Sequence, residues 1–238
     1  MLFGTRALQE ALFLAFAMHM SILRRQAIKT LIRAERNVRT MIDALAIAEE
    51  KGLHPKHRLT RYYSFFLENI TPDDKVLDIG CGNGYVASRV AEKAKLVAAI
   101  DISKKNIEYA KRKFSRKNVA FFIGDATSYN FKEKFDCVIL SNVLEHIRER
   151  HLFLIKIKQL APKILIRVPM INRDWLIFYK RELGLPYMCD KTHFIEYTLE
   201  SFCEEIKAAE LEIQSYSICF GEIWAALQSY TYENPHNI

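Results

Sequence analysis

Short apolar runs alternate with longer amphipathic stretches from residue 75 onward. The apolar runs predict strands at residues 75–80, 96–101, 119–124, 135–140 and 163–168, and the stretches between them predict helices at 84–94, 103–116 and 145–160. Each run is apolar almost without interruption, which is typical of parallel strands that are covered on both faces. The alternation therefore predicts a doubly wound α/β sheet with right-handed crossovers.

The pattern changes after Pro169. Residues 169–197 are rich in aromatic side chains and carry few strand signals. A helix is then expected over residues 199–209 with Thr198 as its N-cap, followed by strands at 212–219 and 222–230. Only Phe220 and Gly221 join those two strands, so they must be antiparallel. The whole pattern predicts a seven-stranded, mostly parallel sheet with an insertion at 169–197.

The N-terminal part has the spacing of a long amphipathic helix. Residues 7–50 predict one or two helices that end near Gly52 and Pro55. Its apolar positions recur about every 3.5 residues. They include Leu8, Leu12, Ala15, Phe16, His19, Leu23, Ile28, Leu31, Ile32, Val38, Met41, Ile42 and Leu45. We therefore divide the chain into a helical arm, residues 1–55, and a domain, residues 56–238.

Most of the excess positive charge belongs to this N-terminal part. The net charge is +7 for 238 residues, and residues 1–62 hold eleven Lys and Arg against five Asp and Glu. Three roles stay open for the arm. It could pack on the domain or on a second copy of the chain, attach peripherally to an anionic membrane, or contact nucleic acid. Because the domain is nearly neutral, nucleic acid is the least favoured partner.

Composition and cysteine usage predict a globular cytoplasmic protein. The five cysteines form no C-x-x-C pair and leave an odd one, as expected in a reducing compartment. The apolar run at residues 11–18 is too short to span a bilayer, and Arg24 and Arg25 stand where a signal peptide would need small residues.

A glycine-rich turn follows the first predicted strand. Residues 76–84 read VLDIGCGNG, with Gly80, Gly82 and Gly84 at alternate positions before the next helix. Such a turn lets a ligand approach the backbone closely. The third glycine of the dinucleotide pattern G-x-G-x-x-G is replaced by Tyr85, and Asp78 would repel a pyrophosphate. The turn therefore favours a cationic nucleoside ligand over a nicotinamide dinucleotide.

Acidic residues end each of the first three predicted strands. Asp78, Asp101 and Asp125 would lie along one edge of the sheet, where open α/β sheets bind ligands. A carboxylate at the second strand can accept both ribose hydroxyls, and one at the third can accept an exocyclic amine. For each Asp alone, capping a helix or ending a strand is the alternative role.

These segments together resemble the first four motifs of class I S-adenosylmethionine-dependent methyltransferases. The resemblance covers about residues 56–230 and includes the two closing strands. It implies S-adenosylmethionine as the cofactor. It also implies that the methionine part, the ribose and the adenine contact Asp78, Gly80, Cys81, Gly82, Gly84, Asp101, Ile102, Asp125, Ala126 and Asn142. Upstream, Arg58 or Arg61 could pair with the methionine carboxylate, and Tyr62 could close over the ligand. A solvated basic turn is the alternative for that segment.

The fourth predicted strand is followed by Glu145 and His146, and the insertion contains His193. We take these three residues as candidates for proton removal from a methyl acceptor or for its orientation. Structural hydrogen bonds are the alternative role for both histidines. We assign no metal ligand. Glu145, His146, Asp190 and His193 could converge on a cation, but Asn142 stands where metal-binding relatives often have a carboxylate.

The sequence thus predicts a methyltransferase that acts on oxygen or nitrogen of a small molecule, sugar or lipid precursor. Two other functions stay open: a catalytically silent cofactor-binding subunit and a nicotinamide-dependent oxidoreductase. The aromatic residues of the insertion could form an acceptor pocket or cover the edge of the sheet. They are Trp175, Phe178, Tyr179, Tyr187, Phe194 and Tyr197.

Overall fold

The computed structural model describes the backbone of residues 3–229 and the side chains of residues 19–229. The chain forms two compact units. The first contains Met1–Leu59 and Tyr179–Pro186, and the second contains Thr60–Phe178 and Tyr187–Ile238. The segment Tyr179–Pro186 thus joins the first unit, although it lies in the expected insertion.

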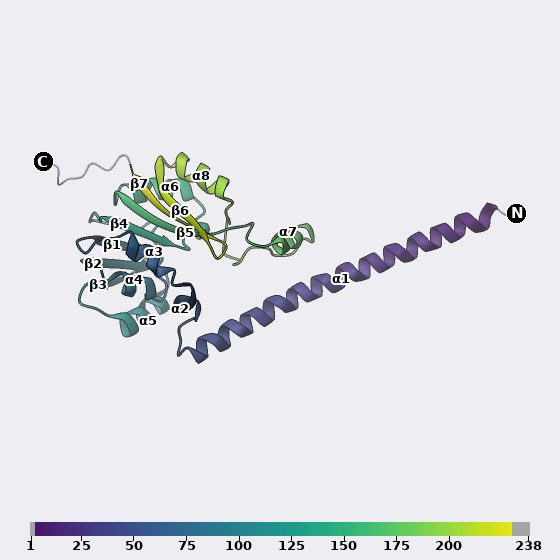
Figure 1. Ribbon diagram of the computed structural model, residues 1–238, viewed down its shortest axis with the longest axis horizontal. Helices are drawn as coiled ribbons and strands as arrows, with labels where there is room; N and C mark the ends of the chain where they lie inside the picture. The colour runs from purple at the N-terminus through teal and green to yellow at the C-terminus, as the bar shows by residue number, and fades with distance from the viewer. Residues whose placement is uncertain (1–2, 230–238) are drawn as a thin grey trace. The chain divides into compact units, whose positions relative to one another are not determined.

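A seven-stranded sheet forms the centre of the second unit (Figure 1). The strand order is β3-β2-β1-β4-β5-β7-β6. Six strands run in the same direction, and β7 runs in the opposite direction between β5 and β6. This confirms the predicted mostly parallel sheet. The strands are β1 (Lys75–Ile79), β2 (Leu96–Asp101), β3 (Val119–Ile123), β4 (Cys137–Ser141), β5 (Lys163–Pro169), β6 (Leu211–Cys219) and β7 (Glu222–Ser229).

Helices cover both faces of this sheet and create two apolar cores. Along β1, Val76 belongs to one core and Leu77 to the other, as the alternation of side chains in a strand requires. The helices that contribute to the core of Val76 are α3 (Tyr63–Glu68), α4 (Tyr85–Val90) and α5 (Lys104–Phe114). Those that contribute to the core of Leu77 are α6 (Arg150–Lys158) and α8 (Leu199–Ala208).

The helix expected over residues 145–160 is interrupted. A 3₁₀ turn, η1 (Leu144–His146), precedes α6, and the backbone of Ile147 between them is extended. The carbonyl of Glu145 accepts a hydrogen bond from the Phe194 amide at 2.8 Å. In a continuous helix this carbonyl would accept a hydrogen bond from the amide of residue 149. The hydrogen bond from Phe194 of the insertion takes the place of that helical bond.

The insertion is also more regular than its sequence indicates. It contains the helix α7 (Trp175–Glu182), and a parallel bridge joins Met170 to Tyr197. The expected N-cap of α8 is present, because Thr198 and Ser201 form a reciprocal capping box. The last residue of the strand expected at 222–230 lies outside the described residues.

The first unit is built on one long helix, α1 (Phe3–Glu49). The spacing of apolar residues over residues 7–50 predicted one or two helices here. Lys51 and Gly52 end it with positive φ angles, and the Gly52 amide donates to the carbonyl of Ile47 at 2.8 Å. The short helix α2 (Lys56–Thr60) follows. The apolar positions expected at Leu8, Leu12, Ala15 and Phe16 lie outside the described side chains. None of the helices in the described part of the chain has both the length and the hydropathy that a membrane span requires.

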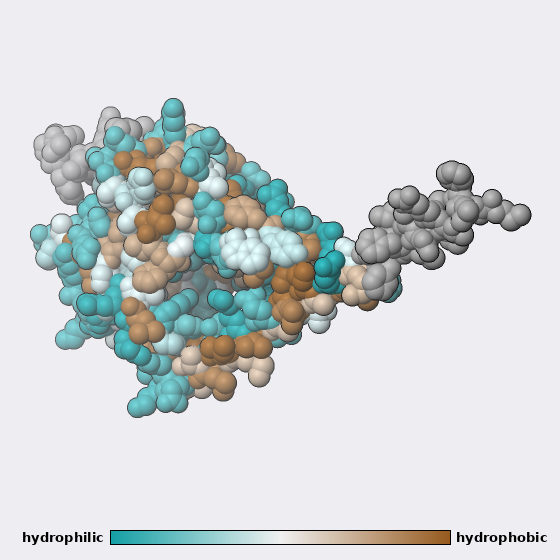
Figure 2. Space-filling view, turned by 45° about the vertical axis from the view of Figure 1, so that its right-hand side comes forward, coloured by the Kyte–Doolittle hydropathy of each residue, from teal (hydrophilic) through white to brown (hydrophobic). Residues whose placement is uncertain are grey.

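Hydrophobic residues on the face shown in Figure 2 occur in small groups among hydrophilic ones. Scattered exposure of this kind is normal for a folded chain.

Candidate functional site

The glycine loop is shaped by close packing at its two ends. Gly80, Gly82 and Gly84 all have φ between +54° and +82°, which favours glycine. A Cβ atom on Gly80 would lie 2.5 Å from Val143 Cγ2, and one on Gly84 would lie 2.6 Å from Ala110 Cβ. A Cβ atom on Gly82 would meet nothing within 4 Å. The loop is thus tightly packed at both ends and open in the middle.

Asp101, at the end of β2, holds this loop in place. Its Oδ2 accepts a hydrogen bond from the Gly82 amide at 2.8 Å, and its Oδ1 accepts from the Ser103 amide at 2.8 Å and from Asn106 Nδ2 at 3.3 Å. The N-cap of α5 is Ser103. A carboxylate offers about four acceptor sites, so Asp101 retains limited capacity for a ligand.

A cavity of about 800 Å³ opens beside the loop, at the carboxyl ends of the parallel strands. Ile102 is 72% exposed in its wall and offers an apolar surface next to Asp101. Seven of the residues expected from the sequence line this cavity: Gly80, Asp101, Ile102, Asp125, Ala126, Asn142 and His146. The position agrees with the rule for open α/β sheets.

The segment after β3 is fixed from both sides. Asp125 Oδ1 accepts hydrogen bonds from the Thr127 amide at 2.9 Å and from its hydroxyl at 2.7 Å. Lys156 on α6 donates to the carbonyls of Ala126, Thr127 and Tyr129 at 2.9, 2.9 and 2.7 Å. Lys156 therefore determines where Asp125 and Ala126 stand in the cavity wall.

Asp78 lies beneath the loop and outside the cavity lining. Its side chain is buried, and Oδ2 has no hydrogen-bond partner in the described structure. Burial, together with the nearby Asp101, raises the pKa of Asp78 to about 8. A buried acid without a partner favours the approach of a cation, which would lower that pKa again.

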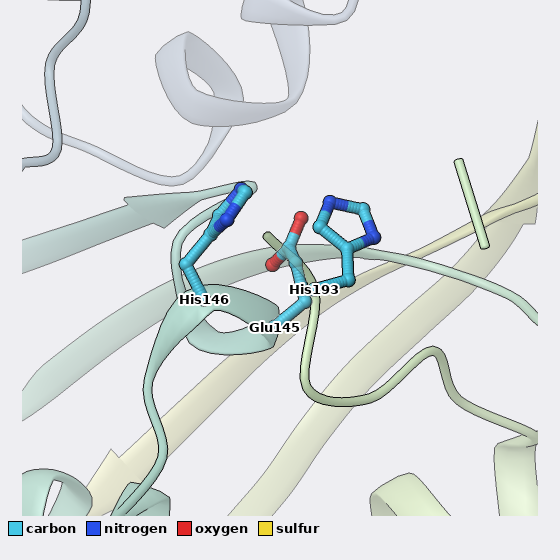
Figure 3. Close-up of side chains that lie close together, drawn as sticks. All are labelled: Glu145, His146 and His193. Atoms are coloured by element: carbon cyan, nitrogen blue, oxygen red, sulfur yellow. The ribbon is translucent and has the colours of Figure 1, made fainter. Parts of the chain in front are cut away.

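Glu145, His146 and His193 come together at the end of η1. Their ligand atoms all lie within 4.8 Å of one another, and Figure 3 shows the Glu145 carboxylate between the two imidazole rings. Both carboxylate oxygens of Glu145 are buried and have no hydrogen-bond partner among the described residues. Burial raises the pKa of Glu145 to about 7. The structure thus brings together the three residues that we expected on the acceptor side.

Hydrogen bonds determine the proton position on His146. Its Nδ1 lies 2.9 Å from Thr192 Oγ1, and the same hydroxyl donates to Asp190 Oδ1 at 2.8 Å. Because a hydroxyl has one proton, Thr192 must accept from His146, which places the proton on Nδ1 and leaves Nε2 free. Burial and the neighbouring His193 lower the pKa of His146. Asp190 thus acts on the cluster through Thr192 and does not join it.

His193 is held in the same way by a buried carboxylate. Its Nδ1 lies 3.0 Å from Glu196 Oε1, and Glu196 also accepts from Arg173 Nη1 at 2.6 Å and from the Cys189 amide. Although burial opposes it, these hydrogen bonds lower the pKa of Glu196. An ionised Glu196 favours the proton on Nδ1 of His193, so Nε2 is the free nitrogen here too.

Comparison with known proteins identifies the fold and the motifs. A family model described as "Methyltransferase domain" matches residues 76–161. Over residues 76–161 this chain is therefore similar to a methyltransferase domain. The methyltransferase domain includes the glycine loop, the carboxylates of β2 and β3, and η1. The cofactor of this family is S-adenosylmethionine.

A curated relative of the methyltransferase domain is the ubiquinone biosynthesis O-methyltransferase of Bartonella tribocorum. It is 31% identical over 118 residues, which cover 48% of each chain. This chain therefore spans about half the length of that relative.

Two solved structures share the fold of the methyltransferase domain. One is a chain from the Haloferax volcanii complex with the Trm112 methyltransferase activator, with a TM-score of 0.62, 15% identity, and coverage of 81% of this chain and 97% of that one. The other is the N-methyltransferase NodS of Bradyrhizobium japonicum with bound S-adenosyl-L-homocysteine. Its TM-score is 0.57 at 14% identity, with coverage of 74% of this chain and 87% of that one.

The remaining residues expected to bind the cofactor lie outside the cavity lining. Cys81 is buried, its amide donates to the Ile100 carbonyl at 3.1 Å, and burial raises the pKa of its thiol. Tyr62 is buried under the guanidinium of Arg167, whose Cζ is 3.8 Å from the ring centroid. Arg58 belongs to the first unit, where it pairs with Glu50 at 2.5 Å.

Several residues of the site carried no sequence signal. Lys156 and Glu196 lie in stretches without a motif. The partners of Lys156 are 27 to 30 residues away in the sequence, and those of Glu196 are 3 to 23 residues away. Arg167, inside β5, interrupts an apolar run and could have been noticed. It donates to Asn142 Oδ1 at 2.7 Å and pairs with Glu222 at 3.1 Å.

Proposed function

We propose that this protein transfers the methyl group of S-adenosylmethionine to an oxygen or nitrogen of a small molecule. One observation carries the proposal. The cavity that has Gly80 of the glycine loop and the carboxylates of Asp101 and Asp125 in its wall is also lined by His146, whose Nδ1 is held by Thr192. The residues expected to bind the cofactor and the candidate proton acceptor thus line one cavity.

The residues present fit this cofactor. S-Adenosylmethionine supplies a methyl group on a positively charged sulfur when it is bound. Asp101 has acceptor capacity for ribose hydroxyls, Asp125 and Ala126 can face the adenine, and Ile102 offers an apolar surface for its ring. The unpartnered oxygen of the buried Asp78 favours the positive end of the ligand.

His146 is the residue best suited to take the proton from a hydroxyl acceptor. It lines the cavity, and its lowered pKa keeps the imidazole neutral at neutral pH. The Thr192–Asp190 pair holds the Nδ1 proton. When Nε2 accepts a proton, the adjacent Glu145 in its ionised form balances the new positive charge. His193 lies behind His146, with ring centroids 4.6 Å apart.

The same three side chains could instead hold a divalent cation. Both Nδ1 atoms have partners, which leaves the Nε2 atoms for a ligand, and the Glu145 oxygens have no hydrogen-bond partner among the described residues; metal ligands are usually supported in this way. A site of two His and one Glu suits Zn²⁺ and similar ions. We favour the base because His146 lines the cavity beside Asp101 and Asp125, whereas Glu145 and His193 do not line it. Turnover that is lost in a chelator and restored by one metal would reverse this choice.

Calorimetry tests the cofactor site. S-Adenosyl-L-homocysteine is titrated into the wild type and into Asp101→Asn and Asp125→Asn, with Asp73→Asn as control because Asp73 is exposed. We expect both site variants to bind about 10-fold or more weakly, as loss of a charge-assisted hydrogen bond predicts, and the control to match the wild type. Binding of a nicotinamide coenzyme in place of this ligand would favour an oxidoreductase.

Turnover separates an enzyme from a silent subunit. Labelled S-adenosylmethionine is incubated with phenols, sugars, amines and lipid precursors, and label transfer is measured for the wild type and His146→Asn. We expect transfer to one acceptor class and at least a 100-fold loss in the variant, as is typical for loss of a general base. Tight cofactor binding with no transfer to any acceptor would favour the silent subunit.

A further inference from the structure

The helix α1 carries an apolar stripe that is bare along its described length. Leu31, Val38 and Leu45 are spaced seven residues apart and are 68%, 54% and 69% exposed. Ala34 and Met41 repeat at the same interval between them, and Met41 is 63% exposed. Two apolar positions per seven residues is the pattern of a helix that packs along another helix.

A neighbouring face of α1 already has contacts within its own unit. Glu35 pairs with Lys180 at 3.2 Å, and Arg25 donates to the carbonyl of Glu182 at 3.4 Å. Ile28 and Ile32 are partly covered on this side. The bare stripe is therefore a separate face. We propose that the stripe binds the same stripe of a second copy of this chain, with the two helices antiparallel.

The charge distribution along α1 favours the antiparallel orientation. Residues 24–39 hold six Lys and Arg and one Glu, whereas residues 43–50 hold three acidic residues and no basic one. Parallel helices in register would place the two basic segments side by side. Antiparallel helices with Leu31 of one copy opposite Met41 of the other place Arg24, Arg25 and Lys29 of each copy beside the acidic segment of the other, which attracts, and only residues 33–39 of the two copies then face each other.

The sizes of the stripe residues also agree with an antiparallel register. If Leu31 of one copy meets Met41 of the other, Val38 lies opposite Ala34 and Leu45 lies opposite Ala27. Two of the three layers thus pair a large residue with a small one, which lets the helices approach closely. The paired region, residues 24–48, is about 37 Å long at 1.5 Å per residue.

The first experiment measures the mass of the full chain by light scattering after gel filtration. We expect about twice the chain mass of 27.8 kDa. Val38→Asp should weaken the dimer about 30-fold or more, because it buries a charge without a partner. Thr40→Asp is the matched control, since Thr40 is exposed and lies off the stripe, and it should remain dimeric. Circular dichroism and binding of S-adenosyl-L-homocysteine verify that both variants are folded.

The second experiment determines the orientation. Leu31→Cys and Met41→Cys are prepared separately and treated with a short thiol crosslinker, and crosslinked peptides are identified by mass spectrometry. We expect residue 31 to link to residue 41 only when the two variants are mixed. Links of residue 31 to itself in the single variant would establish a parallel pair and overturn the proposed orientation.

Two results would overturn the dimer itself. One is the mass of a single chain at about 50 µM with the helix intact, which would assign the stripe to packing within one chain. The other is a single chain that sediments with vesicles containing phosphatidylglycerol and loses this binding in Val38→Asp. That result would assign the stripe to a lipid surface. Neither result affects the proposed methyl transfer.

Discussion

Two acidic residues of this protein are buried where burial costs free energy. Asp78 and Glu145 are both buried carboxyls with unpartnered oxygens. Burying such groups without partners lowers the free energy of unfolding, so a fold keeps them only where a ligand or a reaction needs them. Both lie beside the cavity residues and not in the remote core, which supports a functional reason for their presence.

Glu145→Gln should change how stability depends on pH. The pKa of Glu145 is about 7 in the folded protein and about 4.5 in the unfolded chain. The folded state therefore binds more protons between these values, and the free energy of unfolding falls as pH rises from 4.5 to 7. We expect the variant to be more stable than the wild type by about 1–3 kcal/mol at pH 8, and by little at pH 4.

Urea unfolding at pH 4, 6 and 8, in buffer with a chelator, measures this difference. Glu204→Gln is the control, because Glu204 is exposed on α8. A Glu145→Gln variant that is less stable than the wild type at pH 8 would mean that the carboxylate has a partner in the folded state.

The pH dependence of turnover tests His146 as the base. Its pKa is lowered by burial, so the neutral form persists below pH 6.5. We expect kcat/KM for a hydroxyl acceptor to stay level down to pH 6.5 and to fall tenfold per pH unit below the pKa of His146. Loss of rate that begins above pH 7 would show that His146 is not the group that titrates.

The residues of the candidate site lie where strands end and where helices begin or end. The parallel strands deliver Asp101 and Asp125 to one edge because their carboxyl ends coincide. The interruption between η1 and α6 places Glu145 and His146 beside the insertion, and α6 returns Lys156 to the segment after β3. The acceptor side of the site thus depends on where helices begin and end.

Lys156→Met should weaken cofactor binding without direct contact to the reacting groups. The lysine donates to three carbonyls between residues 126 and 129, so its loss should loosen the segment that carries Asp125. We expect the dissociation constant for S-adenosyl-L-homocysteine to rise about 5- to 30-fold, the equivalent of one to two kcal/mol. Lys113→Met, an exposed change at the end of α5, is the control in the same calorimetric titration. Equal affinities for the two variants would contradict this role.

At the scale of the whole molecule, the chain separates into a unit that contains the sheet and a unit built on one long helix. The sheet and the cavity belong to the second unit, and α1 belongs to the first. We therefore expect cofactor binding and self-association to be independent properties. Changes in the stripe should leave the cofactor affinity unchanged, and changes in the cavity should leave the mass in solution unchanged.

S-Adenosyl-L-homocysteine should stabilise the protein according to its affinity. At a free concentration 100 times the dissociation constant, the free energy of unfolding should rise by about 2.7 kcal/mol. Chemical unfolding followed by tryptophan fluorescence measures this, since Trp224 is buried in the sheet. NADH at the same concentration serves as the control. Equal stabilisation by NADH would contradict the assignment of the cavity to an adenosyl sulfonium.

The sequence by itself determined the sheet, the helical arm and the edge of the sheet at which Asp101 and Asp125 lie. Apolar runs such as those of β2 and β4 must be buried, and Gly80, Gly82 and Gly84 allow a backbone with positive φ, so local patterns are sufficient for these features. That Asp78, Asp101 and Asp125 lie at one edge of the sheet follows from the order of strands and helices.

Only the tertiary structure decided the acceptor side. His193 is 48 positions from Glu145, and the insertion that brings it back has no periodic pattern to predict its path. The partners of His193 and His146, which are Glu196 and Thr192, follow from that path. Local signals report what each segment prefers, whereas contacts between distant segments depend on how they pack, and packing is a property of the folded chain as a whole.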